Sequence, residues 1–250
     1  MKIAVITGAT SGIGAATAQL LLDSGQYKVI VCGRRAERLK LFTENEAYNG
    51  RVLALNFDVR NEGEVKTAID SLPEDWRAID FLLNNAGNAH GLSAFQDGDT
   101  ADWDAMMDGN VKGLLYVSKY IVPFMIARRQ GHIINISSIA GKETYANGAV
   151  YCASKAAVEA ITKGMRIDLL PHNIKVGSIA PGMLNTEFSL VRFKGDSAKA
   201  ESVYKGMDPL VADDIAELIW FMITRKSHIN LADVLILPTA QAAATIVKRD

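Results

Sequence analysis

The sequence has few of the features that mark several large classes of protein. Its 250 residues include only two cysteines, Cys32 and Cys152, which lie far apart without a C-x-x-C spacing. Neither a disulfide framework nor a zinc site is indicated, and we expect no bound metal. The 27 basic residues are balanced by 28 acidic ones, so the chain has no basic field for nucleic acid or anionic lipid. It also lacks an apolar run near the ~20 residues of a membrane span and a signal-peptide pattern. We therefore expect a cytoplasmic protein without nucleic-acid or membrane partners.

An alternation of short apolar runs and helical patterns indicates the fold class. Hydrophobic residues make up 49% of the chain and no linker divides it, so we predict a single domain over residues 1–250. Several runs are apolar on both faces, as are strands of a parallel sheet covered by helices. The alternation predicts an α/β fold built from βαβ units. The seven predicted strands are Lys2–Thr7, Lys28–Cys32, Arg51–Phe57, Ile79–Asn84, His132–Ser137, Lys175–Ala180 and Val234–Leu237.

Helical patterns lie between these runs, and one connection is irregular. The predicted helices are Ser11–Ser24, Ala101–Arg129, Ala149–Leu170 and Asp213–Ile223. Residues 181–206 mix Gly, Pro, Asp and Lys with an apolar cluster. A connection of this length is either a lid over a binding site or a disordered loop. We predict a substrate lid.

The first strand ends in a glycine-rich turn, and a helix follows at once: Thr7-Gly8-Ala9-Thr10-Ser11-Gly12-Ile13-Gly14. Glycines at such a junction let backbone amides approach a pyrophosphate, which then lies at the positive end of the helix dipole. The spacing Gly-x-x-x-Gly-x-Gly is weak by itself, and a plain turn is the alternative. Its position after the first strand of an α/β chain favours a dinucleotide site.

Two arginines follow the second predicted strand, at Gly33-Arg34-Arg35. A dinucleotide fold that prefers NAD usually has an acidic residue at this place, where it binds the adenosine ribose. Two guanidinium groups instead suit a 2′-phosphate. The sequence therefore favours NADP as the cofactor, and the alternative is a pair of solvated arginines at a helix start.

Four further residues have the chemistry of a proton-transfer site. Tyr151 and Lys155 are four apart in a predicted helix, so both side chains leave the same face and a cation can lower the pKa of the phenol. Ser138 ends a predicted strand at the edge where open α/β sheets bind ligands. Asn110 interrupts the apolar pattern of the longest predicted helix. Each residue alone has an ordinary structural explanation.

Taken together, these motifs resemble the short-chain dehydrogenase/reductase family, and the resemblance covers the whole chain. The matching positions are Thr7 to Gly14, Asp58-Val59, Asn84 to Gly87, Asn110, Ser138, Tyr151 to Lys155 and Pro181-Gly182. The family implies a Rossmann-type, doubly wound, seven-stranded parallel sheet and hydride transfer between nicotinamide and a carbinol or carbonyl carbon. Dimers or tetramers are usual, and we predict a homotetramer.

The resemblance also implies a role for each matching residue. Tyr151 exchanges a proton with the substrate oxygen, Ser138 polarises that oxygen, Lys155 holds the nicotinamide ribose and lowers the pKa of Tyr151, and Asn110 positions Lys155. The implied cofactor-binding residues are Gly8, Thr10, Ser11, Gly12, Ile13, Gly14, Arg34, Arg35, Asp58, Val59, Asn85, Ala86, Gly87, Tyr151, Lys155, Pro181, Gly182 and Thr186.

Within the family the chain is similar to the bacterial NADP-dependent 3-hydroxy acid dehydrogenases. The similarity is strongest in residues 185–196, Asn-Thr-Glu-Phe-Ser-Leu-Val-Arg-Phe-Lys-Gly-Asp. It implies substrates such as serine, allo-threonine, 3-hydroxyisobutyrate and 3-hydroxypropionate, with malonic semialdehyde reduction as the reverse direction. A small anion needs a cation, which Arg192 or Lys194 can supply from the lid. The substrate contacts we predict are Ser138, Tyr151 and Arg192.

Other interpretations remain open at the level of sequence. A reductase of 3-oxoacyl thioesters or other ketones shares the catalytic residues, and an NADP-binding regulator without catalysis belongs to a different class. The chain also departs from the group at Asn88 and His90 and in Lys142-Glu-Thr-Tyr145, a loop that can line the pocket.

Overall fold

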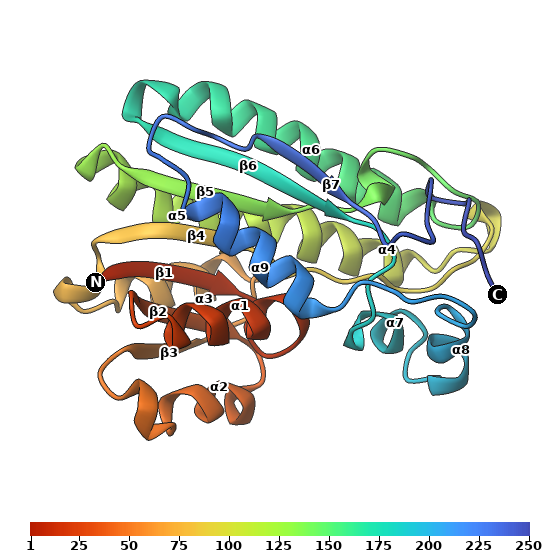
Figure 1. The fold of residues 1–250 in the computed structure, drawn as a ribbon, viewed down its shortest axis with the longest axis horizontal. Coiled ribbons are helices and arrows are strands. Elements are labelled where there is room, and N and C mark those ends of the chain that lie inside the picture. The colour runs from red at the N-terminus through yellow and green to blue at the C-terminus, as the bar shows by residue number, and fades with distance from the viewer.

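The computed structural model describes residues 1–250 and has a seven-stranded parallel sheet at its centre (Figure 1). The strands run in the order β3-β2-β1-β4-β5-β6-β7, and every neighbouring pair is parallel. Each lies within one residue of its predicted run at both ends, so the doubly wound α/β fold is confirmed. The strands are β1 (Lys2–Thr7), β2 (Tyr27–Gly33), β3 (Val52–Asn56), β4 (Ile79–Asn84), β5 (Gly131–Ile136), β6 (Ile174–Pro181) and β7 (Asp233–Ile236).

Helices cover both faces of the sheet, because successive side chains of a buried strand point to opposite sides. Along β1, Ala4 and Ile6 pack into one apolar cluster with α1 (Gly12–Asp23), α2 (Ala36–Thr43) and α9 (Ala212–Ile223). Ile3 and Val5 pack into a second cluster on the opposite face. The helices of that face are α3 (Glu62–Asp70), α5 (Gly113–Arg128) and α6 (Ala149–Leu169).

The prediction of one continuous helix over Ala101–Arg129 is wrong. A π-helical turn at Asp108–Lys112 separates α4 (Thr100–Met107) from α5. Such turns occur where a side chain must leave the regular helical register, often at functional sites, and this one contains Asn110. The helices α2 and α3 have no counterpart in the prediction, because each buries only two apolar side chains.

The irregular segment lies at the carboxyl ends of the strands. Residues 181–206 contain two short helices, α7 (Glu187–Arg192) and α8 (Ser197–Ser202), which Figure 1 shows beyond the ends of the strands. Open parallel sheets bind ligands at this edge. None of the helices combines the length and apolar composition needed to cross a membrane.

Candidate active site

A cleft of about 580 Å³ opens at the carboxyl edge of the sheet, a size suited to a small-molecule ligand. Its walls come from the turn after β1, the ends of β2 to β6, and residues of segment 181–206. Every predicted cofactor-binding residue lines this cleft except Gly14, and so do Ser138 and Arg192. Asn110 is buried behind the wall at 2% exposure.

The turn after β1 has the geometry of an anion cradle. Gly8 and Gly12 have φ angles of 67° and 52°, in the left-handed region where a side chain is strained. Gly14 lies beneath the turn, where a Cβ would collide with the carbonyl of Gly8. The side-chain amide of Asn85, the residue after β4, donates to the Gly8 carbonyl at 3.3 Å and fixes the turn to the end of that strand. Ser11 makes no side-chain cap, so the first amides of α1 are free for a ligand.

The two arginines after β2 are not equivalent. Arg35 donates to the hydroxyl of Thr10 at 3.0 Å and pairs with Glu187 at 2.8 Å, and Arg38 pairs with the same carboxylate at 2.6 Å. Arg34 is 60% exposed, and its nearest carboxylate is Asp58 at 3.5 Å. The guanidinium available to a 2′-phosphate is therefore mainly that of Arg34. Neither Arg38 nor Glu187 was predicted as a site residue, because their contact joins segments 149 residues apart.

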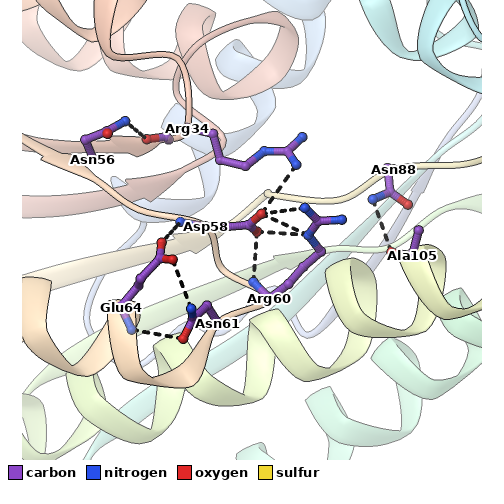
Figure 2. Close-up of polar contacts among 9 residues, drawn as sticks. Arg34, Asn56, Asp58, Arg60, Asn61, Glu64, Asn88 and Ala105 are labelled. Atoms are coloured by element: carbon purple, nitrogen blue, oxygen red, sulfur yellow. Dashed lines mark hydrogen bonds and ion pairs between the residues drawn. The ribbon is translucent and has the colours of Figure 1, made fainter.

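Asp58 is the centre of a polar network beside Arg34 (Figure 2). Its carboxylate accepts hydrogen bonds from Nε and Nη2 of Arg60 at 2.9 and 2.6 Å, and its backbone amide donates to Glu64 at 2.9 Å. Burial raises the pKa of Asp58, but the hydrogen bonds from Arg60 outweigh it, so the pKa lies below its usual range. A fixed carboxylate thus lies at the end of the cleft where the adenosine of the cofactor was expected. Arg60, which holds this carboxylate, was not among the predicted site residues.

The four predicted catalytic residues lie near one another at the other end of the cleft. Tyr151 and Lys155 are on α6 and are 7% and 6% exposed. Ser138 follows β5, and its Oγ accepts the Ala140 amide at 3.1 Å, which holds the side chain in place. Asn110 belongs to the π-helical turn. The parallel sheet brings them together because Ser138 follows one strand and α6 packs beside the next.

Asn110 is held by three hydrogen bonds. Its Oδ1 accepts the backbone amide of Asn88 at 2.7 Å, and its Nδ2 donates to the Asn88 carbonyl at 2.9 Å and to the Ser154 hydroxyl at 3.0 Å. A Cβ on Gly87 would lie 2.8 Å from Asn110 Oδ1 and 3.5 Å from Lys155 Nζ. Both side chains therefore adjoin the same glycine, and only glycine leaves room between them and the cleft.

The lowering of the pKa of Tyr151 by Lys155 stays a prediction. Lys155 Nζ donates to the Ile136 carbonyl at 3.0 Å. Burial raises the pKa of Tyr151 above that of a free phenol, and the cation that opposes this rise is Arg192. Burial also lowers the pKa of Lys155 to about 8, against the opposing effect of the Glu159 carboxylate. Glu159 was missed in the sequence, although it follows Lys155 at the same four-residue spacing.

Of the two predicted anion-binding residues, only Arg192 lines the cleft. Its guanidinium lies 4.9 Å from the ring centroid of Tyr151 and donates to the hydroxyl of Tyr145 at 2.6 Å. Its Nε is buried without a hydrogen-bond partner. Lys194 points away and pairs with Asp102 at 3.0 Å. The position of Tyr145 confirms that the loop after Ser138 lines the pocket.

Three further residues at which the chain departs from the pattern of 3-hydroxy acid dehydrogenases are Asn88, His90 and Lys142. Asn88 lines the cleft and donates from Nδ2 to the Ala105 carbonyl at 3.2 Å (Figure 2). His90 lies in a small adjoining pocket that Tyr151 also lines. Lys142 pairs with Asp233 at 2.6 Å and lies 3.5 Å from the buried carboxylate of Glu159.

Comparison with known proteins gives a consistent result. Residues 2–195 match the family model for short chain dehydrogenases. The chain is 42% identical over 243 residues to the NADP-dependent 3-hydroxy acid dehydrogenase YdfG of Salmonella typhi, covering 97% of both chains. It is 43% identical over 250 residues to sulfoacetaldehyde reductase 2 of Chromohalobacter salexigens, covering 99% of both. Its structure is similar to the closed form of serine dehydrogenase complexed with NADP⁺, with a TM-score of 0.94 and 39% identity, covering 99% of this chain and 100% of that one.

These similarities extend over nearly the whole chain, so they confirm the predicted enzyme class and cofactor. The protein is an NADP-dependent oxidoreductase that acts on CH–OH groups. The hypothesis of a regulator without catalysis is therefore not needed. The chain belongs to the short-chain dehydrogenase family.

Proposed function

We propose that the enzyme transfers a hydride between NADP(H) and a small 3-hydroxy acid of the serine, allo-threonine, 3-hydroxyisobutyrate or 3-hydroxypropionate class. The observation that supports this class most is the position of Arg192, which lies 4.9 Å from the Tyr151 ring with a buried, unpartnered Nε. A guanidinium with free donors suits a carboxylate. A 3-hydroxy acid has its carbinol two carbons from the carboxylate carbon, so one small molecule can contact both side chains.

Tyr151 and Ser138 carry the proton transfer in this proposal, and Lys155 and Asn110 support them. In oxidation, the substrate hydroxyl gives its proton to the phenolate of Tyr151, and the hydroxyl of Ser138 hydrogen-bonds the substrate oxygen. Lys155, one helical turn along α6, holds the nicotinamide ribose, and Asn110 fixes the wall behind it. The nicotinamide supplies the hydride acceptor, or the donor in the reverse direction.

The residues along the cleft fit NADP from one end to the other. The free amides of α1 and the glycines Gly8 and Gly12 suit the pyrophosphate. Arg34 suits the 2′-phosphate, with Arg35 beside it, and Asp58 suits the adenine end. The wall formed by Asn85, Ala86, Gly87, Pro181, Gly182 and Thr186 leaves room for the nicotinamide end.

A small aldehyde with a sulfonate is the second candidate substrate. The 43% identical relative is named a sulfoacetaldehyde reductase. In sulfoacetaldehyde, as in a 3-hydroxy acid, a single carbon separates the anionic group from the reacting carbon. Arg192 can donate to either anion. A 3-oxoacyl thioester, the alternative from sequence, has no anion at this distance and gives Arg192 no role.

We also propose that segment 181–206 is the substrate lid. Contacts at both ends of α7 support this role. Glu187 pairs with Arg35 and Arg38 at the adenosine end, and the carbonyl of Arg192 accepts the Gly91 amide at 3.0 Å at the substrate end. A lid fixed at both ends of the cleft excludes water from the reacting groups.

An NADP-reduction screen tests the substrate class. The screen covers L-serine, the allo-threonines, 3-hydroxyisobutyrate, 3-hydroxypropionate and 2-hydroxyethanesulfonate, with acetoacetyl thioester reduction as the comparison. Arg192→Gln should raise KM for the anions by about 10-fold or more, since a charge-assisted hydrogen bond contributes about 1.5–3 kcal/mol. Lys194→Gln, two residues away in the same segment, is the matched control. Faster turnover of the thioester than of every anion would contradict the proposal.

We propose in addition that the chain assembles as a homotetramer. Large apolar side chains are exposed on α5 at Leu115, beside the end of α6 at Ile167 and Leu170, and on β7 at Leu235. Apolar surface of this kind is typical of a subunit interface. Sedimentation at assay concentration should give a mass of four chains, and a monomer would contradict the proposal.

A further inference from the structure

We propose that Glu187 sets how tightly the enzyme binds NADP(H). Its carboxylate is a counter-charge to the arginines of the 2′-phosphate site, and it keeps the affinity for this phosphate below the value that the arginines alone would give. The proposal rests on the proposed function only in placing the 2′-phosphate at Arg34, with Arg35 beside it. It does not depend on which substrate the enzyme takes.

The carboxylate of Glu187 lies between two guanidinium groups in the wall of the cofactor cleft. Its Oε2 accepts a hydrogen bond from Arg35 at 2.8 Å, and its Oε1 accepts one from Arg38 at 2.6 Å. The preceding residue, Thr186, adjoins the phosphate cradle, because a Cβ on Gly12 would lie 3.3 Å from its methyl group. Glu187 itself lines the cleft. A negative charge therefore lies beside the groups that receive the phosphates of the cofactor.

Arg35 does not need Glu187 to stay in position. Its Nε and Nη2 donate to the Thr10 hydroxyl at 3.2 and 3.0 Å, and Nη2 also donates to the Ser11 hydroxyl at 2.8 Å. These three contacts attach the guanidinium to the turn after β1, and none of them involves α7. Glu187 therefore contributes mainly charge, not position, to Arg35.

The counter-charge is present at neutral pH. Burial raises the pKa of Glu187, but the hydrogen bonds from Arg35 and Arg38 outweigh it and hold the pKa below its usual range. The group of Arg35, Arg38 and Glu187 thus has one net positive charge, where the two arginines alone would have two. A phosphate monoester has nearly two negative charges at pH 7, so its attraction to the site depends directly on this sum.

A weaker attraction has a use in a dehydrogenase. The cofactor leaves in its altered redox form after each turnover, and product release limits the rate of many enzymes. Differences in affinity between related complexes are mostly differences in dissociation rate. A carboxylate beside the 2′-phosphate site therefore speeds cofactor exchange, while the arginines still select NADP over NAD.

The test measures Kd for NADPH and for NADH by nucleotide fluorescence at low ionic strength. Glu187→Gln should bind NADPH about 2–5-fold more tightly than the parent, the gain expected for one partly exposed charge. The gain should be smaller for NADH, which lacks the 2′-phosphate, and should shrink as salt is added. The release rate of NADPH, measured by displacement with excess NADP⁺, should fall by a similar factor.

Two variants serve as controls on the same surface. Glu37→Gln removes an exposed acid from the first turn of α2 and should leave the ratio of the two Kd values unchanged. Glu187→Asp keeps the charge on a shorter side chain, so its affinity for NADPH should stay nearer to that of the parent than to that of Glu187→Gln.

Arg38 provides an independent measurement, which also serves if Glu187→Gln does not fold. Arg38 does not line the cleft, so it matters to the phosphate only through its charge. Arg38→Gln should weaken NADPH binding about 2–5-fold. The double variant Arg38→Gln/Glu187→Gln has the same net charge as the parent and should return close to the parent Kd.

The outcomes are decisive for Glu187. Weaker NADPH binding in Glu187→Gln overturns the proposal, because it shows that the carboxylate is needed to place the arginines. Unchanged binding, or an equal gain for NADPH and NADH, also overturns it. Arg34→Ala tests the proposed place of the 2′-phosphate separately: if this variant binds NADPH normally, that placement is wrong whatever Glu187→Gln does.

Discussion

His132 makes the stability of the fold sensitive to acid. It lies on β5 with 5% exposure, and neither ring nitrogen has a hydrogen-bond partner. Burial, with the nearby charge of Lys175, lowers the pKa of His132 from 6.5 to about 3. The folded protein therefore keeps the ring neutral, whereas the unfolded chain takes up a proton near pH 6.5. The stability that this neutral ring provides is present above that pH and is lost as the pH falls toward 3.

The size of the loss follows from the two pKa values. Between about pH 7.5 and about pH 5, protonation of this histidine stabilises the unfolded chain and leaves the folded protein almost unaffected. The interval extends roughly 1.5 pH units below the unfolded pKa, and each unit is worth about 1.36 kcal/mol, so the free energy of unfolding falls by about 2 kcal/mol. His132→Leu removes the titrating group and should abolish this part of the pH dependence. At neutral pH the substitution should cost little, because it replaces a buried polar ring that has no partner.

Guanidinium denaturation at a series of pH values measures the effect. The difference in unfolding free energy between His132→Leu and the parent protein should change by about 2 kcal/mol across that interval, in favour of the variant at low pH. His228 is exposed, so His228→Leu is the matched control and should run parallel to the parent. A constant difference between His132→Leu and the parent at every pH would refute the reasoning.

Three further predictions concern activity. Tyr151→Phe should lower kcat by about 10²–10⁴-fold, because it removes the acid/base group, while fluorescence should show unchanged NADPH binding. Arg34→Ala should raise KM for NADPH by about 10-fold or more and leave KM for NADH unchanged. Glu159→Gln should lower the pKa of Lys155 further below its burial-lowered value of about 8. The alkaline limb of the kcat profile should then move to lower pH, whereas Asp233→Asn, on the far side of Lys142, should leave it in place.

The fold and the strand-end residues could be predicted because both follow from local patterns. A buried parallel strand is apolar on both faces, and the residue after it lies at the ligand edge whatever the rest of the chain does. Ser138 and the turn from Gly8 to Gly14 were found in this way. The π-helical turn at Asn110 could not be placed, because the hydrogen bond that Asn110 accepts there comes from Asn88, which belongs to another segment.

The contacts of α7 were beyond prediction for the same reason, and they connect the two ends of the cleft. Glu187 begins this six-residue helix and Arg192 ends it. In the proposed lid, a movement of α7 as one unit that withdraws Arg192 from Tyr151 also separates Glu187 from Arg35 and Arg38. The lid proposal therefore makes closure of the segment and the arrangement of the arginines near the 2′-phosphate site one equilibrium. Thermodynamic linkage makes this relation reciprocal. If binding of the cofactor raises the ratio of closed to open segment by some factor, the closed state binds the cofactor more tightly than the open state by the same factor. In this proposal NADP promotes the same closure that places Arg192 beside Tyr151, although the two sites are at opposite ends of the cleft.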